Sequence, residues 1–313
     1  MADFLEAEFP HRPLIGGNVL DVGEKMVMFG ESEAGKSYLA IQLAYCLASA
    51  SPFLGFTVPH RSRVLMLQSE LSEYRYQERC EKLAVSYPKE MRGNVFVWST
   101  ETLKINVEAN KQVLARIVED TQADVVMVDP LRAFLRGSEN ESEDVESWLN
   151  AIGEIQEATH TFTLIYVHHI NKPVPGFFTK LTKASARGSG LLTDRPSAAL
   201  GLEMNETQTE WTLHFVKTRN REKRPEPILL APDYTTGLFV PQGIADVGIK
   251  FDGLLELVGE GIAMSELATA LLDVKGFANR QSTYEYVNRA AREKIVRKEK
   301  MDGTNRLFIR PGE

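Results

Sequence analysis

Cysteine is scarce in this 313-residue chain, which contains only Cys46 and Cys80. Both lie in segments predicted to be helical, so the sequence argues against a disulfide framework or a cysteine-rich metal site and fits a reducing compartment. No apolar run approaches the roughly 18 residues that a membrane-spanning helix needs. Residues 1–6 are acidic and lack the basic start of a signal peptide. We therefore expect a cytoplasmic protein with no membrane segment.

Basic residues are also in the minority. Lys and Arg number 36 against 43 Asp and Glu, which gives a net charge of −7. This balance argues against a generally basic nucleic-acid binder, although a local cluster of charge counts for more than the sum. The composition, 43% hydrophobic and 25% charged, is that of a globular protein. The length suits one large α/β domain and a small second domain.

What the sequence does contain is a phosphate-binding loop at residues 30–37, GESEAGKS. It matches G-x-x-x-x-G-K-[ST], follows a strand-like run at 25–29 and precedes an alanine- and leucine-rich helix at 38–48. In such a loop the backbone N–H groups and the helix N-terminus hold phosphate, Lys36 reaches the β- and γ-phosphates, and Ser37 binds Mg²⁺. The predicted nucleotide-binding residues are Gly30, Glu31, Ser32, Glu33, Ala34, Gly35, Lys36, Ser37 and Tyr38.

Two acidic residues follow strand-like segments. Residues 124–129 are apolar and close on Asp129, a Walker B pattern in which Asp129 would hold Mg²⁺ opposite Ser37. Glu70 follows residues 63–68, at the strand end where open α/β sheets bind ligands. Glu70 is either the base that activates the water attacking the γ-phosphate or a solvated carboxylate at a helix N-terminus.

His168 and His169 end another buried-strand pattern at residues 161–167. A histidine pair can bind a metal, but the sequence shows no third ligand nearby. We predict that one of the two senses the γ-phosphate through a hydrogen bond. The alternative is a structural histidine with its hydrogen bonds satisfied.

A basic loop follows at residues 171–188, which contain four cations and no acidic residue. Phe177 and Phe178 interrupt it, and aromatic residues among cations are typical of single-strand binding. The alternative is a solvated, flexible loop. The predicted DNA-binding residues are Lys172, Lys180, Lys183 and Arg187.

The pattern becomes antiparallel after residue 197, with strand-like segments at 198–203, 210–217 and 227–230. Lys217 and Arg219 alternate at the end of one strand, so both are available to a phosphate unless they are simply solvated surface. Pro241 is predicted to begin a linker. An N-terminal arm over residues 1–24 would pack on its own sheet or on a neighbouring subunit.

The last part of the chain, residues 249–313, predicts a small second domain after a core over 25–243. Helices are expected at 253–257, 265–272 and 280–295, followed by a β-hairpin that closes at Phe308. Three helices and a β-wing predict a winged helix-turn-helix. Residues 279–313 hold nine Lys or Arg against five Asp or Glu, a balance that suits nucleic acid, although winged helices also bind proteins or act as lids.

Taken together, these motifs resemble the RecA-like hexameric ATPases, most closely the RepA-like branch of replicative helicases. The resemblance covers roughly residues 10–240 and is carried by the order of the motifs. They are the P-loop, Pro52-Phe53-Leu54-Gly55, the strand ending at Glu70, Asp129, His168-His169, Ala186-Arg187-Gly188-Ser189-Gly190 and Asp194.

Lys217-Thr218-Arg219-Asn220 is similar to the finger motif of the related DnaB-like helicases. The resemblance implies that this motif reaches the ATP of the next subunit in a ring. In the RepA-like branch a finger arginine follows the aspartate that matches Asp194, but Arg195 is not aligned with it, which leaves two candidates for the finger.

The resemblance implies an α/β fold with a RecA-like P-loop core and a mostly parallel sheet, and the winged helix-turn-helix is added by its own pattern. ATP and Mg²⁺ are the expected cofactors, and a homohexameric ring that moves on single-stranded DNA is the expected function. This is the role of a replicative DNA helicase of phage, plasmid or bacterial origin, with other replication proteins as partners. The predicted catalytic residues are Glu70, Lys36, His168, His169, Lys217 and Arg219. The alternative is an ATP-switched DNA-binding regulator, helicase loader or recombination factor that does not unwind DNA.

Overall fold

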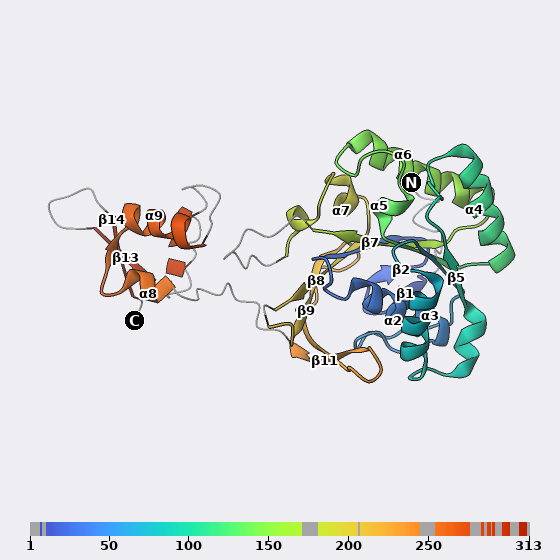
Figure 1. The fold of residues 1–313 in the computed structure, drawn as a ribbon, viewed down its shortest axis with the longest axis horizontal. Helices are drawn as coiled ribbons and strands as arrows, with labels where there is room; N and C mark the ends of the chain where they lie inside the picture. The colour runs from blue at the N-terminus through green and yellow to red at the C-terminus, as the bar shows by residue number, and fades with distance from the viewer. Residues whose placement is uncertain are drawn as a thin grey trace. The chain divides into compact units, whose positions relative to one another are not determined.

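The computed structural model describes residue 7 and residues 11–170, 181–205, 207–244, 254–275, 283–284, 287–288, 290–291, 296–300 and 307–311. The chain divides into two compact units (Figure 1). One comprises Met1–Asn171 and Leu181–Asp246, and the other comprises Lys172–Lys180 and Val247–Glu313. Among the described residues, no helix combines the length and the apolar character needed to cross a membrane.

The larger unit is organised around a nine-stranded sheet in the order β11-β10-β9-β8-β3-β7-β6-β4-β5. Six neighbouring strands run parallel, and β9, β10 and β11 continue the sheet in antiparallel fashion. The parallel strands are β3 (Lys25–Gly30), β4 (Val64–Gln68), β5 (Val95–Ser99), β6 (Val125–Asp129), β7 (Thr163–His169) and β8 (Ala198–Met204). The antiparallel strands are β9 (Trp211–Thr218), β10 (Ile228–Pro232) and β11 (Phe239–Ile244). The predicted α/β core with a mostly parallel sheet is confirmed.

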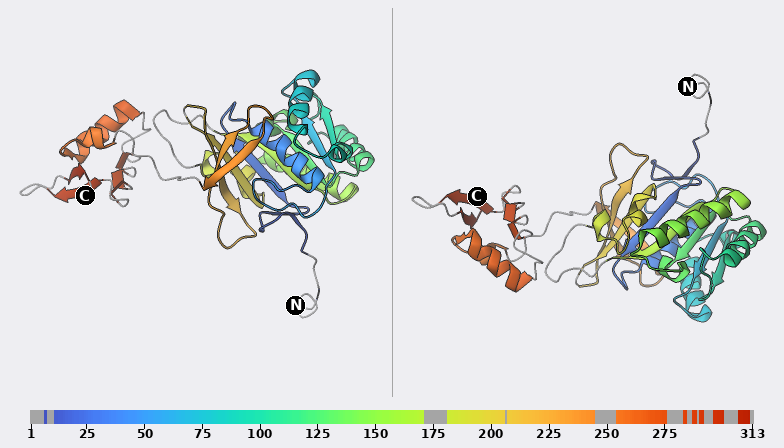
Figure 2. Two further views of the ribbon diagram at one scale, coloured as in Figure 1. Left: turned by 90° about the horizontal axis from the view of Figure 1, so that it is seen from below. Right: turned by 90° about the horizontal axis from the view of Figure 1, so that it is seen from above.

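Helices cover both faces of the sheet, which is why the central strands are apolar throughout rather than alternating with polar residues. Met66 and Met127 pack with α2 and α3 on one face, while their neighbours Leu65 and Val126 pack with α4, α5 and α6 on the other. Figure 2 shows α2 in front of the sheet from below and α6 in front of it from above. The helices are α2 (Lys36–Ser49), α3 (Glu73–Ala84), α4 (Glu108–Thr121), α5 (Leu131–Phe134), α6 (Ser142–Ala158) and α7 (Leu191–Asp194), with 3₁₀ turns at Lys89–Asn94 and Lys183–Ser185.

The described part of the N-terminal arm forms a short hairpin of β1 (Pro13–Ile15) and β2 (Leu20–Asp21). Ile15 and Leu20 are fully buried in the same apolar cluster as α2. This part of the arm therefore covers its own sheet.

The linker predicted to begin at Pro241 is wrong, because Pro241 lies inside β11 and pairs with Leu230 of β10. The register shifts beside Leu230, and β11 is an edge strand, a position where proline removes no hydrogen bond that the sheet needs. Phe239 at the start of β11 is buried, and this burial holds the strand against the core.

The described residues of the smaller unit form a three-stranded antiparallel sheet in the order β12-β14-β13 and two helices. Its elements are α8 (Leu254–Val258), β12 (Ile262–Ala263), α9 (Met264–Lys275), β13 (Val296–Lys300) and β14 (Leu307–Pro311). Leu254, Leu267, Leu271 and Ile309 form part of a core of its own. The helix predicted at 280–295 and the turn of the predicted β-hairpin lie largely outside the described residues.

Candidate nucleotide site and the cations beside it

The carboxyl ends of β3, β7, β6 and β4 meet at one edge of the sheet. Gly30, the first residue of the P-loop, stands in register with His169, and Gln68 stands in register with Asp129. Because parallel strands end on the same side, the P-loop, the two histidines and Asp129 gather there, with Glu70 two residues beyond β4. Sequence-distant motifs thus form one site.

The P-loop turns into α2 through two residues with positive φ, Glu33 at 65° and Gly35 at 85°. Glycine is required at position 35, since a Cβ there would also lie 2.8 Å from the Phe239 ring. Lys36 is buried, and its Nζ donates to the carbonyl oxygen of Glu31 inside the loop. Burial lowers the pKa of Lys36, and the carboxylates of Asp129, Glu70 and Glu31 oppose that shift.

The antiparallel strands support the P-loop from the side. The Gln42 side chain exchanges two hydrogen bonds with the backbone of Phe239, at 2.9 and 2.8 Å, and this joins α2 to β11. Trp211 of β9 donates its indole N–H to the Ala34 carbonyl at 2.8 Å and packs edge-on against Phe239. The loop conformation therefore depends on strands almost 200 residues away in sequence.

Tyr38, the last of the predicted nucleotide-binding residues, lies half-buried in the first turn of α2. The guanidinium of Arg79 from α3 stands 4.9 Å from the centre of the Tyr38 ring. This cation–π contact places a further positive charge at the rim of the site.

Asp129 and Ser37 supply the oxygen ligands that Mg²⁺ prefers. The Ser37 side chain lies close enough to the buried Asp129 carboxylate to affect its pKa. Burial raises the pKa of Asp129 to about 6, the charge of Glu70 adds to this, and Ser37, Lys36 and His169 oppose it. Mg²⁺ usually takes one or two protein ligands and completes its shell with water and phosphate oxygens, so this hydroxyl–carboxylate pair fits the ion.

Glu70 is held by a turn that the side chain of Gln68 organises. The buried Gln68 amide donates to the carbonyl of Leu71 at 2.9 Å and accepts from the Leu71 N–H at 3.2 Å. The Glu70 carboxylate is about half exposed and lies 3.7 Å from His169 Nε2. The nearby imidazole of His169, together with the charges of Lys36 and Arg79, lowers the pKa of Glu70, and partial burial opposes this shift.

The two histidines occupy different environments. His168 is fully buried, and its Nε2 donates to the carbonyl of Arg187 at 2.6 Å. Burial lowers the pKa of His168, so the ring is neutral and this N–H is the only one it has. His169 is partly exposed and faces Glu70. Its carbonyl accepts from the Arg187 N–H at 3.0 Å, so both histidines bind the backbone at the end of the basic loop.

The basic loop is described only from residue 181 onward, so Lys172 and Lys180 lie outside the described residues. Lys183 pairs with Asp194 at 3.0 Å. Arg187 pairs through Nε with Glu139 at 2.8 Å, and the Glu139 side chain is only 6% exposed. These two cations therefore have acidic partners, which the loop's own sequence does not contain.

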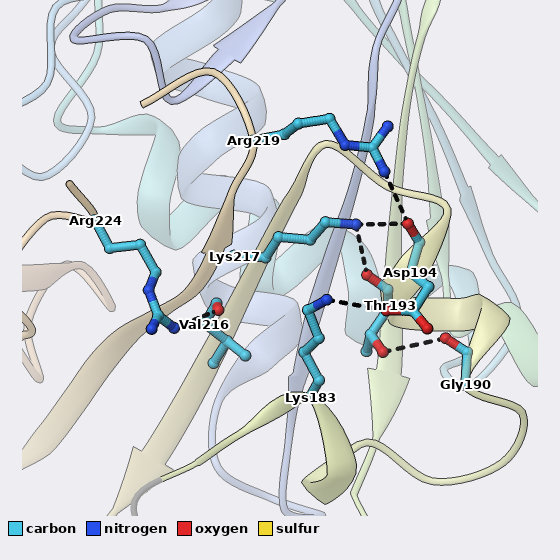
Figure 3. Close-up of polar contacts among 8 residues, drawn as sticks. All are labelled: Lys183, Gly190, Thr193, Asp194, Val216, Lys217, Arg219 and Arg224. Atoms are coloured by element: carbon cyan, nitrogen blue, oxygen red, sulfur yellow. Dashed lines mark hydrogen bonds and ion pairs between the residues drawn. The ribbon is translucent and has the colours of Figure 1, made fainter. Parts of the chain in front are cut away.

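Lys217 and Arg219 both reach back to the last turn of α7 (Figure 3). Lys217 Nζ donates to the carbonyls of Thr193, at 3.1 Å, and Asp194, while an Arg219 Nη atom donates to the Asp194 carbonyl at 3.1 Å. The register of β8 and β9 shifts at Val216, whose carbonyl accepts from Arg224 at 2.7 Å. Arg195, the other finger candidate, instead pairs with Glu146 of α6 at 2.9 Å.

A model of the family AAA_25, described as an AAA domain, matches residues 1–174. The chain belongs to the AAA_25 family. The solved structures that resemble it include a KaiC-like protein from the hyperthermophilic archaeon Pyrococcus horikoshii OT3, with a TM-score of 0.53 and 15% identity over 73% of this chain and 93% of that one. Another solved ATPase domain gives a TM-score of 0.52 and 14% identity over 69% of this chain and 84% of that domain. No curated protein matches the chain. The fold is thus that of a RecA-like P-loop ATPase, and the comparisons do not single out the RepA-like branch.

The match to the AAA_25 model ends before β8, so the cations on β9 lie outside it. Three residues of this AAA_25 protein serve the site without belonging to any of the sequence motifs, namely Gln68, Glu139 and Arg79. In the sequence Glu139 is one of several neighbouring acidic residues, and no pattern predicts that it is the buried partner of Arg187. The one available signal was Gln68, a polar residue that ends an otherwise apolar strand.

Proposed function

We propose that the protein hydrolyses ATP with Mg²⁺, assembles as a ring and moves on single-stranded DNA. The observation that carries this proposal is the grouping of Lys36, the Ser37–Asp129 pair and Glu70 at one sheet edge, with the lowered pKa of Glu70 favouring its ionised form. A carboxylate in that form can accept the proton of the attacking water. Lys36 binds the phosphates, and Ser37 and Asp129 hold the metal.

His169 is the residue we assign to sensing the γ-phosphate. It is partly exposed and lies beside Glu70, whereas the single N–H of the neutral His168 is already donated to Arg187. His168 then acts on the basic loop rather than on the nucleotide. Together the two residues provide a short connection from the γ-phosphate to the backbone that closes the loop.

Lys217 and Arg219 are proposed to act on the triphosphate of a neighbouring subunit. Their partners among the described residues are backbone carbonyls, so neither is committed to a buried carboxylate. Cations of this kind stabilise the charge that develops during phosphoryl transfer. A ring in which each site is completed by the next subunit follows from this assignment.

The smaller unit is proposed to be a winged helix that adds a second DNA contact. Its antiparallel sheet and the helices α8 and α9 support that interpretation. If the basic loop binds the single strand, replacing Lys172 and Lys180 by Gln reduces the logarithmic salt slope of binding by about 0.7 for each phosphate that is no longer neutralised. An unchanged slope, together with loss of binding on truncation after Ile244, would assign binding to the smaller unit instead.

The deciding experiment measures ATP hydrolysis with and without single-stranded DNA, and strand separation on a forked duplex. The proposal predicts stimulation by single strands together with separation of the duplex. Sequence-specific binding to duplex DNA, without stimulation or separation, would support the alternative of an ATP-switched regulator.

A further inference from the structure

Three cations from two segments of the chain converge on the turn that ends α7 (Figure 3). Lys183 comes from the 3₁₀ turn within the basic loop, while Lys217 and Arg219 come from the end of β9. Lys183 holds the Asp194 carboxylate, and the other two hold backbone carbonyls of the same turn. One exposed acidic residue thus lies between a predicted DNA-binding lysine and the Lys217–Arg219 pair.

The charges at this turn do not balance, because three cations face one carboxylate. Partial burial, followed by repulsion from Arg219 and Lys183, lowers the pKa of Lys217 to about 8, and Asp194 opposes this. Lys183 therefore lowers the pKa of Lys217 in two ways. It repels the charge of Lys217, and it pairs with the carboxylate that would otherwise offset that charge. Any anion that draws Lys183 away removes both effects.

The same turn is anchored to the chain that leaves the basic loop. The N–H of Asp194 and the hydroxyl of Thr193 donate to the Gly190 carbonyl at 2.9 and 3.2 Å. One residue earlier, Ser189 donates its N–H to the Glu139 carbonyl at 2.8 Å and pairs with Ser142 through the hydroxyls. This fixed backbone leaves the side chain of Asp194 as the group that can change partners.

We propose that Asp194 is a positioning residue that passes its carboxylate from Lys183 to the Lys217–Arg219 pair when Lys183 binds a phosphate of single-stranded DNA. The carboxylate then keeps the pair charged and ordered toward the triphosphate of the neighbouring subunit. DNA binding and hydrolysis are coupled in this way. The inference rests on the proposed function, because it needs both a DNA-bound loop and a shared nucleotide site.

Two substitutions test this coupling through opposite effects on basal hydrolysis. In Lys183→Gln the Asp194 carboxylate has no lysine at position 183 to pair with and stays with Lys217 and Arg219. Basal hydrolysis therefore rises toward the stimulated rate. In Asp194→Asn no carboxylate can be passed on, so hydrolysis stays at the basal rate even at saturating DNA. In both variants the stimulation ratio falls by at least about fivefold, the lower end of typical coupling between sites. A merely structural role would lower hydrolysis in both.

Three controls accompany the pair. Asp194→Glu keeps the carboxylate and should keep the stimulation. Glu146→Gln removes the ion pair to Arg195 one residue further along and should also keep it. Thermal unfolding midpoints show whether each variant is folded, and Asp194 is exposed enough for the amide to be accommodated.

The outcomes separate the two proposals. Stimulation of Asp194→Asn equal to that of the unsubstituted protein, or a basal rate in Lys183→Gln no higher than normal, would overturn the role of Asp194 alone. Absence of stimulation in the unsubstituted protein would overturn the proposed function and the coupling with it.

Discussion

The parallel part of the sheet carries the buried Lys36, and the antiparallel part carries the half-buried Lys217. The charged groups that dominate around the two lysines are opposite in sign. Lys36, in the P-loop that follows β3, has three carboxylates near it that oppose the effect of burial on its pKa. Lys217, on β9, has two cations near it that add to the effect of burial. The positive charge of Lys36 is thus compensated by several carboxylates, while that of Lys217 is offset only by Asp194, which pairs with Lys183.

If the nucleotide site is shared as proposed, this difference shows how it would be divided between subunits. The parallel half would supply the P-loop, the metal ligands and Glu70 from one chain. The antiparallel half supplies cations that gain most from an anion not provided by their own surroundings. The same half also supports the P-loop through Trp211 and Phe239, so the two contributions cannot be separated by removing a strand.

Loss of Arg219 is expected to have the largest effect. Arg219→Ala should lower turnover by about 10³-fold or more, because a cation in this role stabilises the transition-state charge. ATP binding should be retained, since Arg219 lies outside the P-loop of its own chain. Equilibrium binding of a fluorescent ATP analogue and steady-state hydrolysis check both parts.

The matched control is Arg195→Ala, which removes the arginine that pairs with Glu146 of α6. Turnover in this variant should remain normal. The opposite pattern, with Arg195 essential and Arg219 dispensable, would identify Arg195 as the finger and overturn the assignment.

Glu70→Gln is expected to have the next largest effect, and it acts on the parallel half. The amide cannot accept a proton from water, so turnover should fall by about 10²–10⁴-fold while ATP binding persists. Glu73→Gln, at the exposed first turn of α3, serves as the control. Near-normal turnover in Glu70→Gln would mean that the carboxylate only caps the turn.

The smallest expected effect is on the pH profile of kcat/KM, and it distinguishes Lys217 from Lys36. The pKa of Lys217 is about 8, so its charge is present below that pH and is lost above it. The groups that face it are Arg219, Lys183 and Asp194, with the carbonyls of α7. In the absence of DNA, kcat/KM should therefore decline as pH rises through about 8.

Lys217→Arg should remove this decline, because a guanidinium does not titrate in that range. The profile is measured at saturating Mg²⁺ with the ATP concentration varied. An alkaline limb that stays in place in Lys217→Arg would show that another group causes it.

The sequence predicted the parallel strands and the antiparallel strands β9 and β10 well but missed β11, for physical reasons. Strands buried on both faces are continuous apolar runs, and the P-loop has a fixed spacing, so β3, β4, β6 and β7 could be located from residues alone. β11 could not, because Pro241 and Gly243 look like a linker until the edge position and the register shift are known.

The sequence also could not predict which side chains pair with each other. The spacing of the motifs does not predict that Arg187 pairs with Glu139 or that Lys183 pairs with Asp194, because the two members of each pair lie in different turns or helices. The alternation of Lys217 and Arg219 predicted that both are available to a phosphate. It could not indicate that both are held by the carbonyls of α7.

The measurement that tests the central claim most directly is a mixing experiment. Lys36→Ala removes the cis half of the site and Arg219→Ala removes the trans half, so each variant alone should be inactive. In a mixed ring, some interfaces combine the intact P-loop of one variant with the intact Arg219 of the other. With equal amounts and random assembly, about a quarter of all interfaces in a head-to-tail ring would be complete. The account predicts that mixing restores hydrolysis under conditions where fluorescence transfer shows the subunits to exchange, and exchange without any restored hydrolysis would contradict it.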